Sequence, residues 1–253
     1  MIPRLSRYIV LALLSAAPLL HATELQTLQN LHEFRSDGYV TGTYVLIDNN
    51  LFERVREPGN RETYNSSLKN MDQLLRKMGN PTELRRPYDS LVALIRQLEG
   101  QSIEEAHYHL ATVNQVMMAH ADLDKAAAAE YDRLAQDAPE DLLALHRQSL
   151  ETNQILLLYQ NSMFSSIGVY FVEAKEGLFT EMDERISKRA EKLRELLPEL
   201  EATFDQLDKQ YNFIKPRLLD HRADWVPTIA AFYLLRNTNT LNTLSRDALK
   251  RGA

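Results

Sequence analysis

Apolar side chains recur at alternating spacings of four and three residues between Ile186 and Tyr211. This spacing puts them along one side of an α-helix, as in the seam of a coiled-coil-like helix pair. Glu, Lys and Arg occupy the positions between them and suit the solvent side of the same helix. The pattern therefore favours helices that pack lengthwise. The seam contains Ile186, Ala190, Leu193, Leu197, Leu200, Phe204, Leu207 and Tyr211.

Pro198 interrupts this seam. Proline lacks the backbone N–H of a helix interior and disfavours helical geometry at the preceding residue, Leu197. The apolar spacing nevertheless continues in phase beyond the proline. We therefore predict one long, kinked helix with a heptad-like seam, in preference to two separate helices.

The remaining segments are rich in strong helix formers, and Gly and Pro separate them. Breaks of this kind occur at 58–60, 79–81, around Gly100 and at 137–139. No Gly/Ser linker, fixed-period repeat or low-complexity tail divides the chain. The sequence predicts an all-α fold, an elongated multi-helix bundle of about five to seven helices, forming a single domain over residues 23–253.

Two stretches, 38–47 and 166–172, are rich in β-branched and aromatic residues and raise the alternative of a strand pair. A lone two-stranded ribbon is only marginally stable, so we favour buried helices. Gly38 and Gly42 lie four residues apart, and Gly168 lies in the second stretch, so two helices could cross closely there. The aromatic residues beside the crossing are the first candidate ligand site, although ordinary core packing is the favoured explanation: Tyr39, Tyr44, Tyr170 and Phe171.

A polar band from Asn237 to Thr243 is the second candidate ligand site. Asn and Thr are poor residues for a helix interior, yet here they form a polar band beside Leu234, Leu241 and Leu244. Inside a bundle, Asn237 and Asn239 could bind a small ligand or fix the register of the helices. A weakly helical exposed face is the alternative that we favour.

Residues 1–22 have the composition of a secretory signal peptide. Arg4 and Arg7 precede an almost wholly apolar stretch from Tyr8 to Leu20, which is shorter than the roughly 20 residues of a membrane span. We expect cleavage after Ala22, with an uncleaved N-terminal anchor as the alternative. No later stretch is apolar enough to span a membrane, so a soluble periplasmic or secreted protein of a Gram-negative bacterium is expected, without stable membrane insertion after cleavage.

The charge balance argues against nucleic acid as a partner. The chain has 35 acidic and 29 basic residues, and removal of residues 1–22 takes the formal net charge from -6 to -8. Phosphate binding needs clustered Lys and Arg, which this chain lacks. It also has no Cys, so neither disulfides nor covalent haem attachment can form.

Catalytic and metal-binding motifs are not apparent. Glu104 and His107 form half of a di-iron carboxylate signature, but no second Glu-x-x-His step follows. There is no His-Glu-x-x-His motif, nucleophile elbow or Gly-rich phosphate loop. We therefore predict no catalytic residue, no metal and no cofactor, and we expect the histidines at the surface. Two acids that meet in space, as in a glycosidase, stay an open alternative.

Residues 184–248 resemble the helical extracytoplasmic sensing module of pilus-type chemoreceptors. The resemblance lies in residues 184–189, in Trp225 and in the Leu/Asn-rich last segment, and covers about a quarter of the chain. The Gln-Arg-rich run of that family is missing. The resemblance implies a sensor-like role and does not identify the chain as a member.

Together, these features predict an exported, non-catalytic interaction or adaptor protein. Its partner would be another periplasmic protein or a second copy of the chain. A small-ligand-binding or sensor-like bundle is the alternative, and a hydrolase or lyase without a recognisable motif is the third. The docking surface is expected along six seam residues: Ile186, Leu193, Leu197, Leu200, Phe204 and Leu207.

Overall fold

The computed structural model describes residues 5–50, 57–102, 106–165, 177–220 and 225–252. These residues form eight α-helices and two short 3-10 helices, and no strand occurs among them. The predicted all-α class is confirmed, and the helices outnumber the expected five to seven. Their bounds are α1 Leu5–Asp48, α2 Pro58–Lys77, α3 Thr82–Glu99, α4 Ala106–Leu134, η1 Ala135–Asp137, α5 Glu140–Ser165, α6 Leu178–Leu196, η2 Pro198–Leu200, α7 Glu201–Leu219 and α8 Pro227–Gly252.

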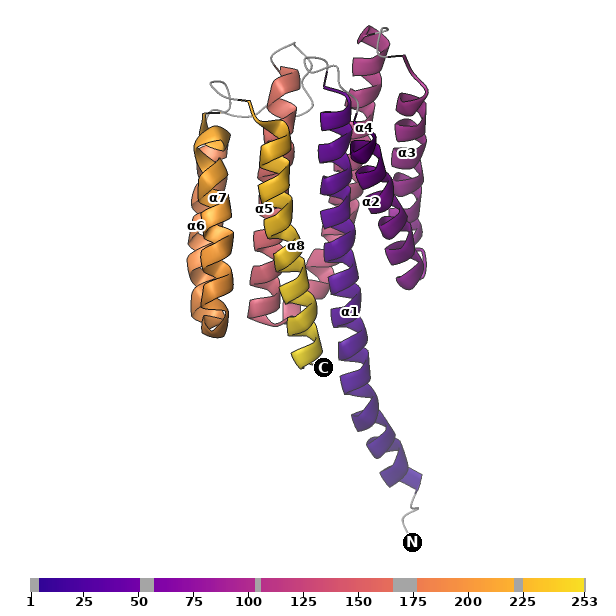
Figure 1. Ribbon diagram of the computed structural model, residues 1–253. Helices are drawn as coiled ribbons and strands as arrows, with labels where there is room; N and C mark the ends of the chain where they lie inside the picture. The colour runs from indigo at the N-terminus through magenta and orange to yellow at the C-terminus, as the bar shows by residue number, and fades with distance from the viewer. Residues whose placement is uncertain (1–4, 51–56, 103–105, 166–176, 221–224, 253) are drawn as a thin grey trace.

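The helices run alongside one another, with α1 in the middle (Figure 1). Helices α2, α3 and α4 lie on one side of α1, and α5 to α8 lie on the other. Helix α1 packs against α2, α4, α5 and α8, so it joins the two sides. Its N-terminal part extends beyond the other helices in Figure 1. The expected cleavage after Ala22 stays a prediction.

The predicted long, kinked helix is wrong, because the chain reverses direction at Pro198. Helix α6 ends at Leu196, and Leu197 has φ -133° and ψ 61°, outside the helical region. After one 3-10 turn, α7 returns beside α6 as the second arm of a hairpin (Figure 1). Arg194 of α6 stabilises the hairpin through ion pairs to two residues of α7, Asp205 at 2.9 Å and Asp208 at 2.6 Å.

The core has two main parts, one on each side of α1. Leucines and aromatic residues of α1 to α4 form the first, which includes fully buried Leu28, Leu31, Leu75 and Leu91. The second lies among α5, α6, α7 and α8 and includes Tyr159, Ile214 and Leu234. Burial of such side chains contributes about 1.5–3 kcal/mol each relative to exposure. A smaller apolar cluster of the same four helices, which includes Leu145, Leu193, Phe204 and Leu241, lies nearer the hairpin turn.

The stretch 38–47 is helical, as predicted, and lies within α1. A Cβ atom added at Gly42 would come within 3.2 Å of Leu157 Cδ1, so the glycine allows α5 to approach closely. Gly38 faces His120 of α4 and Met71 of α2 instead. The predicted partner stretch 166–172, with Gly168, lies outside the described residues.

Among the described residues, none of the helices combines the length and the apolar character needed to cross a bilayer.

Candidate functional site

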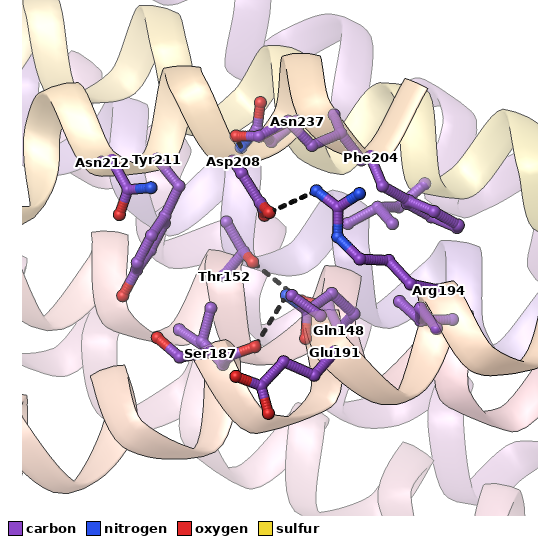
Figure 2. A pocket seen from close by; sticks show the side chains of 15 residues that line it. Gln148, Thr152, Ser187, Glu191, Arg194, Phe204, Asp208, Tyr211, Asn212 and Asn237 are labelled. Atoms are coloured by element: carbon purple, nitrogen blue, oxygen red, sulfur yellow. Dashed lines mark hydrogen bonds and ion pairs between the residues drawn. The ribbon is translucent and has the colours of Figure 1, made fainter. Parts of the chain in front are cut away.

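A cavity of about 170 Å³ lies between the α6–α7 hairpin and helices α5 and α8 (Figure 2). The apolar seam that was predicted as one helix lies on both arms of the hairpin, and it supplies two facing walls of this cavity. Helix α5 contributes Gln148 and Thr152, and α8 contributes Asn237 and Leu241. The hairpin contributes Ile186, Ser187, Ala190, Glu191, Leu193, Arg194, Phe204, Leu207, Asp208, Tyr211 and Asn212.

Two buried amides line the cavity. The Gln148 side chain donates from Nε2 to the backbone carbonyl of Ile186 at 3.1 Å. The Asn237 side chain donates from Nδ2 to the carbonyl of Leu207 at 2.9 Å. Gln148 is 7% exposed and Asn237 4% exposed. Neither amide oxygen has a hydrogen-bond partner among the described residues, although both are shielded from solvent.

Charged groups stand nearer the solvent. Arg194 of α6 bonds Asp208 of α7, as the dashed line in Figure 2 shows. Glu191 is exposed and forms no ion pair with any described residue. Asn212 is exposed as well, so it and Glu191 mark the side on which the cavity meets solvent.

Aromatic rings complete the walls. Phe204 and Tyr211 lie seven residues apart on α7, and both are buried. The Tyr211 hydroxyl donates to Asp183 Oδ1 at 3.1 Å. Burial raises the pKa of Tyr211 far above its ordinary value, and the neighbouring Asp183 carboxylate adds to the shift. Tyr211 is therefore a neutral hydrogen-bond donor in this site.

The described residues of the two predicted ligand sites lie in different surroundings. Asn237 lines the cavity, whereas Asn239 is exposed on α8 and lies outside it. Tyr39 is buried beside α4, where its hydroxyl donates to Asp124 Oδ2 at 2.8 Å. Tyr44 is a partly buried residue that packs against both core parts. Tyr170 and Phe171 lie outside the described residues.

The six predicted docking residues are used within the chain. Ile186, Leu193, Phe204 and Leu207 line the cavity, and Leu197 and Leu200 lie at the hairpin turn. All but the half-buried Leu200 are buried. The seam thus packs on its own returning arm and on α5 and α8, and it presents little apolar surface to solvent.

A second polar cluster fills the interior on the other side of α5. Asn242 of α8 is its centre: its Oδ1 lies 2.8 Å from His32 Nε2 and accepts from Ser149 Oγ at 2.6 Å. Its Nδ2 donates to Ser36 Oγ at 3.0 Å. His32 stacks on His146 with ring centroids 3.9 Å apart.

The surface position expected for the histidines is wrong for four of them. His32, His109, His120 and His146 are all buried. Burial lowers the pKa of His32 to about 4, and it holds the pKa of His146 well below its ordinary value. Both rings are therefore neutral at pH 7. His146 bonds Tyr131 and Gln29 through its two ring nitrogens, at 3.0 and 2.8 Å.

An exposed aromatic face lies elsewhere on the C-terminal side. Phe213 of α7 and Phe232 of α8 are 51% and 59% exposed. Both rings contact Tyr233, with centroids 4.9 and 5.2 Å apart. Ile229, 47% exposed, lies one turn before Phe232. We call these four residues the α7–α8 face.

The sequence named Asn237 as a candidate, but the exposed face favoured for its polar band is wrong at Asn237, Thr238 and Asn242, which are buried. Gln148, Thr152 and the histidine cluster were missed. The available signal was a run of polar residues in the middle of α5, at 148, 149, 152 and 153, which occupies two adjoining sides of that helix. Over the described residues, no group of three or more His, Asp or Glu side chains is placed to hold a metal ion.

Comparison with known proteins gives no further assignment. No protein-family model, no curated protein and no solved structure matches the chain.

Proposed function

We propose that this protein is an exported helical bundle that binds a small polar molecule in the cavity between α5, α8 and the α6–α7 hairpin. The single observation that carries this proposal is the pair of unpartnered amide oxygens, Gln148 Oε1 and Asn237 Oδ1. The proposal takes up the alternative interpretation of the sequence, a ligand-binding or sensor-like bundle.

The two oxygens are costly to bury without a hydrogen-bond donor. A buried polar atom without a partner costs about 1–3 kcal/mol, and these two acceptors belong to residues that line one cavity. A ligand that donates a hydrogen bond to each oxygen recovers that cost on binding. A cavity of about 150 Å³ holds a molecule the size of benzene, and this cavity of about 170 Å³ has similar room.

Export supports a role in binding molecules from outside the cytoplasm. The basic N-terminus and the apolar stretch up to Leu20 are typical of a secretory signal. We propose cleavage after Ala22 and a periplasmic or secreted location. N-terminal sequencing of protein from the periplasmic fraction should begin at Thr23, and a start at Met1 in the membrane fraction would contradict it.

Filling the cavity tests the binding function. In Ala190→Leu, a larger side chain enters the cavity from α6, whereas Ala202→Leu adds the same atoms at an exposed site on α7. A panel of small polar metabolites should contain compounds that raise the melting temperature of the wild type and of Ala202→Leu. The same compounds should leave the melting temperature of Ala190→Leu unchanged. Equal shifts in all three proteins would place binding outside the cavity.

The α7–α8 face supports a second candidate function, self-association through two copies of this face. Exposed aromatic clusters are more frequent at protein interfaces than on the remaining surface. Sedimentation velocity over a range of concentrations should show a dimer that Phe213→Ser with Phe232→Ser abolishes. A protein that stays monomeric at all concentrations would remove this candidate and leave the cavity proposal intact.

A further inference from the structure

We infer that the cavity ligand is a small nitrogen cation with N–H donors, of the ammonium, amidinium or guanidinium class. This inference rests on the proposed binding function and adds the chemistry of the ligand to it. Three features of the cavity carry it: the orientation of the buried amides, the charge of the lining and the aromatic walls.

The orientation of each amide is fixed by its partner. A backbone carbonyl can only accept a hydrogen bond, so the group facing Ile186 O must be the NH₂ of Gln148. The same reasoning fixes the NH₂ of Asn237 towards Leu207 O. The free atom of both side chains is therefore an oxygen. Both oxygens accept hydrogen bonds, and a ligand that satisfies them must be a donor.

The charge of the lining selects a cation among such donors. Glu191 and Asp208 contribute two carboxylates, and Arg194 contributes the single positive group of the lining. The Arg194 guanidinium is already engaged by Asp205 and Asp208, and is therefore not free to bind an anionic ligand. Glu191, unpaired within the described residues, remains to balance a positive ligand.

The walls suit the same class of ligand. Phe204 and Tyr211 provide aromatic rings, whose faces attract cations at separations up to about 6 Å. Leu193, Leu207 and Leu241 provide apolar surface for the carbon atoms of the ligand. An ammonium or guanidinium group with a short carbon chain matches a cavity of this size, and we place its N–H groups towards the oxygens of Gln148 and Asn237.

Isothermal titration calorimetry at constant ionic strength can test the inference with three probes of similar size. Methylguanidinium chloride is a cation with N–H donors, acetamide is a neutral donor, and sodium acetate is an anion. We expect methylguanidinium to bind at least tenfold more tightly than acetamide, and acetate not to bind.

Variants locate the probe in the cavity. Gln148→Met removes the free oxygen at nearly constant volume and should weaken methylguanidinium binding at least tenfold. Gln160→Met is the matched control, since Gln160 is also a buried α5 glutamine whose Nε2 donates to a backbone carbonyl, at 3.0 Å, but it lies outside the cavity.

Glu191→Gln removes the unpaired charge and should weaken binding about threefold. Glu184→Gln, at another exposed glutamate of α6, should leave binding unchanged. Because Glu191 is exposed, its substitution keeps the test decisive even where Gln148→Met does not fold.

The outcomes separate the inference from the proposed function. Acetate binding that Ala190→Leu abolishes would overturn the cationic ligand and leave a ligand-binding cavity standing. Methylguanidinium binding that none of the cavity variants changes would overturn the inference as well. If no probe binds and the metabolite panel gives no shift that depends on Ala190, the cavity holds ordered water only and both proposals fall.

Discussion

The two polar clusters of the interior share helices α5 and α8 but differ in how many of their polar atoms have hydrogen-bond partners. Around Asn242, the amide oxygen and the amide nitrogen both have partners, drawn from α1 and α5. Around Asn237, five residues earlier on α8, the nitrogen has a partner and the oxygen has none. The Asn242 cluster is a nearly closed network, whereas the Asn237 cluster borders empty space.

This difference indicates different roles for the two clusters. A buried network whose members satisfy one another stabilises one register of the helices, because a shifted register would leave several groups unpaired. In the closed network, only Asn153 Oδ1 lacks a partner among the described residues of that cluster. We expect the open cluster to contribute less to folding, and its free acceptors are those that we propose for the ligand.

The largest effect is expected for Asn242→Leu. The substitution leaves Ser36, Ser149 and His32 with buried polar atoms that have lost a partner. We expect the free energy of unfolding to fall by roughly 3 kcal/mol, measured by urea denaturation with circular dichroism. Asn239→Leu, at an exposed position of the same helix, should change it by less than about 0.5 kcal/mol. A loss below about 1 kcal/mol for Asn242→Leu would show that the network adds little to folding.

The pH dependence of the free energy of unfolding should also report on this network, because His32 belongs to it. The folded-state pKa of His32, about 4, lies below the unfolded value of 6.5, so the unfolded chain binds more protons between these pH values. The contribution of neutral His32 to the free energy of unfolding is therefore fully present above pH 6.5 and is lost as the pH falls towards 4. His32 alone should remove about 2 kcal/mol between pH 7 and pH 5.

Asp37 acts in the opposite direction. Burial raises the pKa of Asp37 to about 7, so as the pH falls this carboxyl binds a proton in the folded protein before it does in the unfolded chain. Its contribution to the free energy of unfolding therefore increases as the pH falls. The measurement should therefore use Asp37→Asn as background. In that background, His32→Gln should make the stability profile between pH 7 and pH 5 flatter. An unchanged profile would mean that the pKa of His32 is the same in the folded protein and in the unfolded chain.

The smallest effect is expected for Asn237→Leu, the same substitution in the open cluster. It removes one hydrogen bond to Leu207 O, but it also removes a buried oxygen that has no partner. The two contributions oppose each other, so the free energy of unfolding should change by less than about 1 kcal/mol. A loss as large as that of Asn242→Leu would show that the two clusters do not differ.

The helical class was predictable from sequence because it depends on local properties. Helix formers and apolar spacing identify helices wherever they pack, and 38–47 proved helical despite its β-branched residues. The reversal at Pro198 was not predictable in the same way. An in-phase seam can continue along one kinked helix or face itself in a hairpin, and tertiary contacts such as Arg194 with Asp208 decide between them.

A site residue was predictable from sequence only where its type differed from that of its sequence neighbours. Asn237 stood out as a polar residue among the leucines of the last segment. Gln148 did not, because glutamine is equally common on exposed helix faces. His32 and His146 were assigned to the surface because their partners, Asn242 and Gln29, lie 210 and 117 residues away in sequence.

The hairpin of α6 and α7 is the wall through which a ligand of the proposed site would enter. Its main packing partners are α5 and α8, and the core of α1 to α4 is built without it. A small outward rotation of the hairpin would widen the cavity without breaking any contact among the first four helices. The same rotation would stretch the hydrogen bond from Gln148 to Ile186 O, so the angle of the hairpin would change with occupancy of the proposed ligand site.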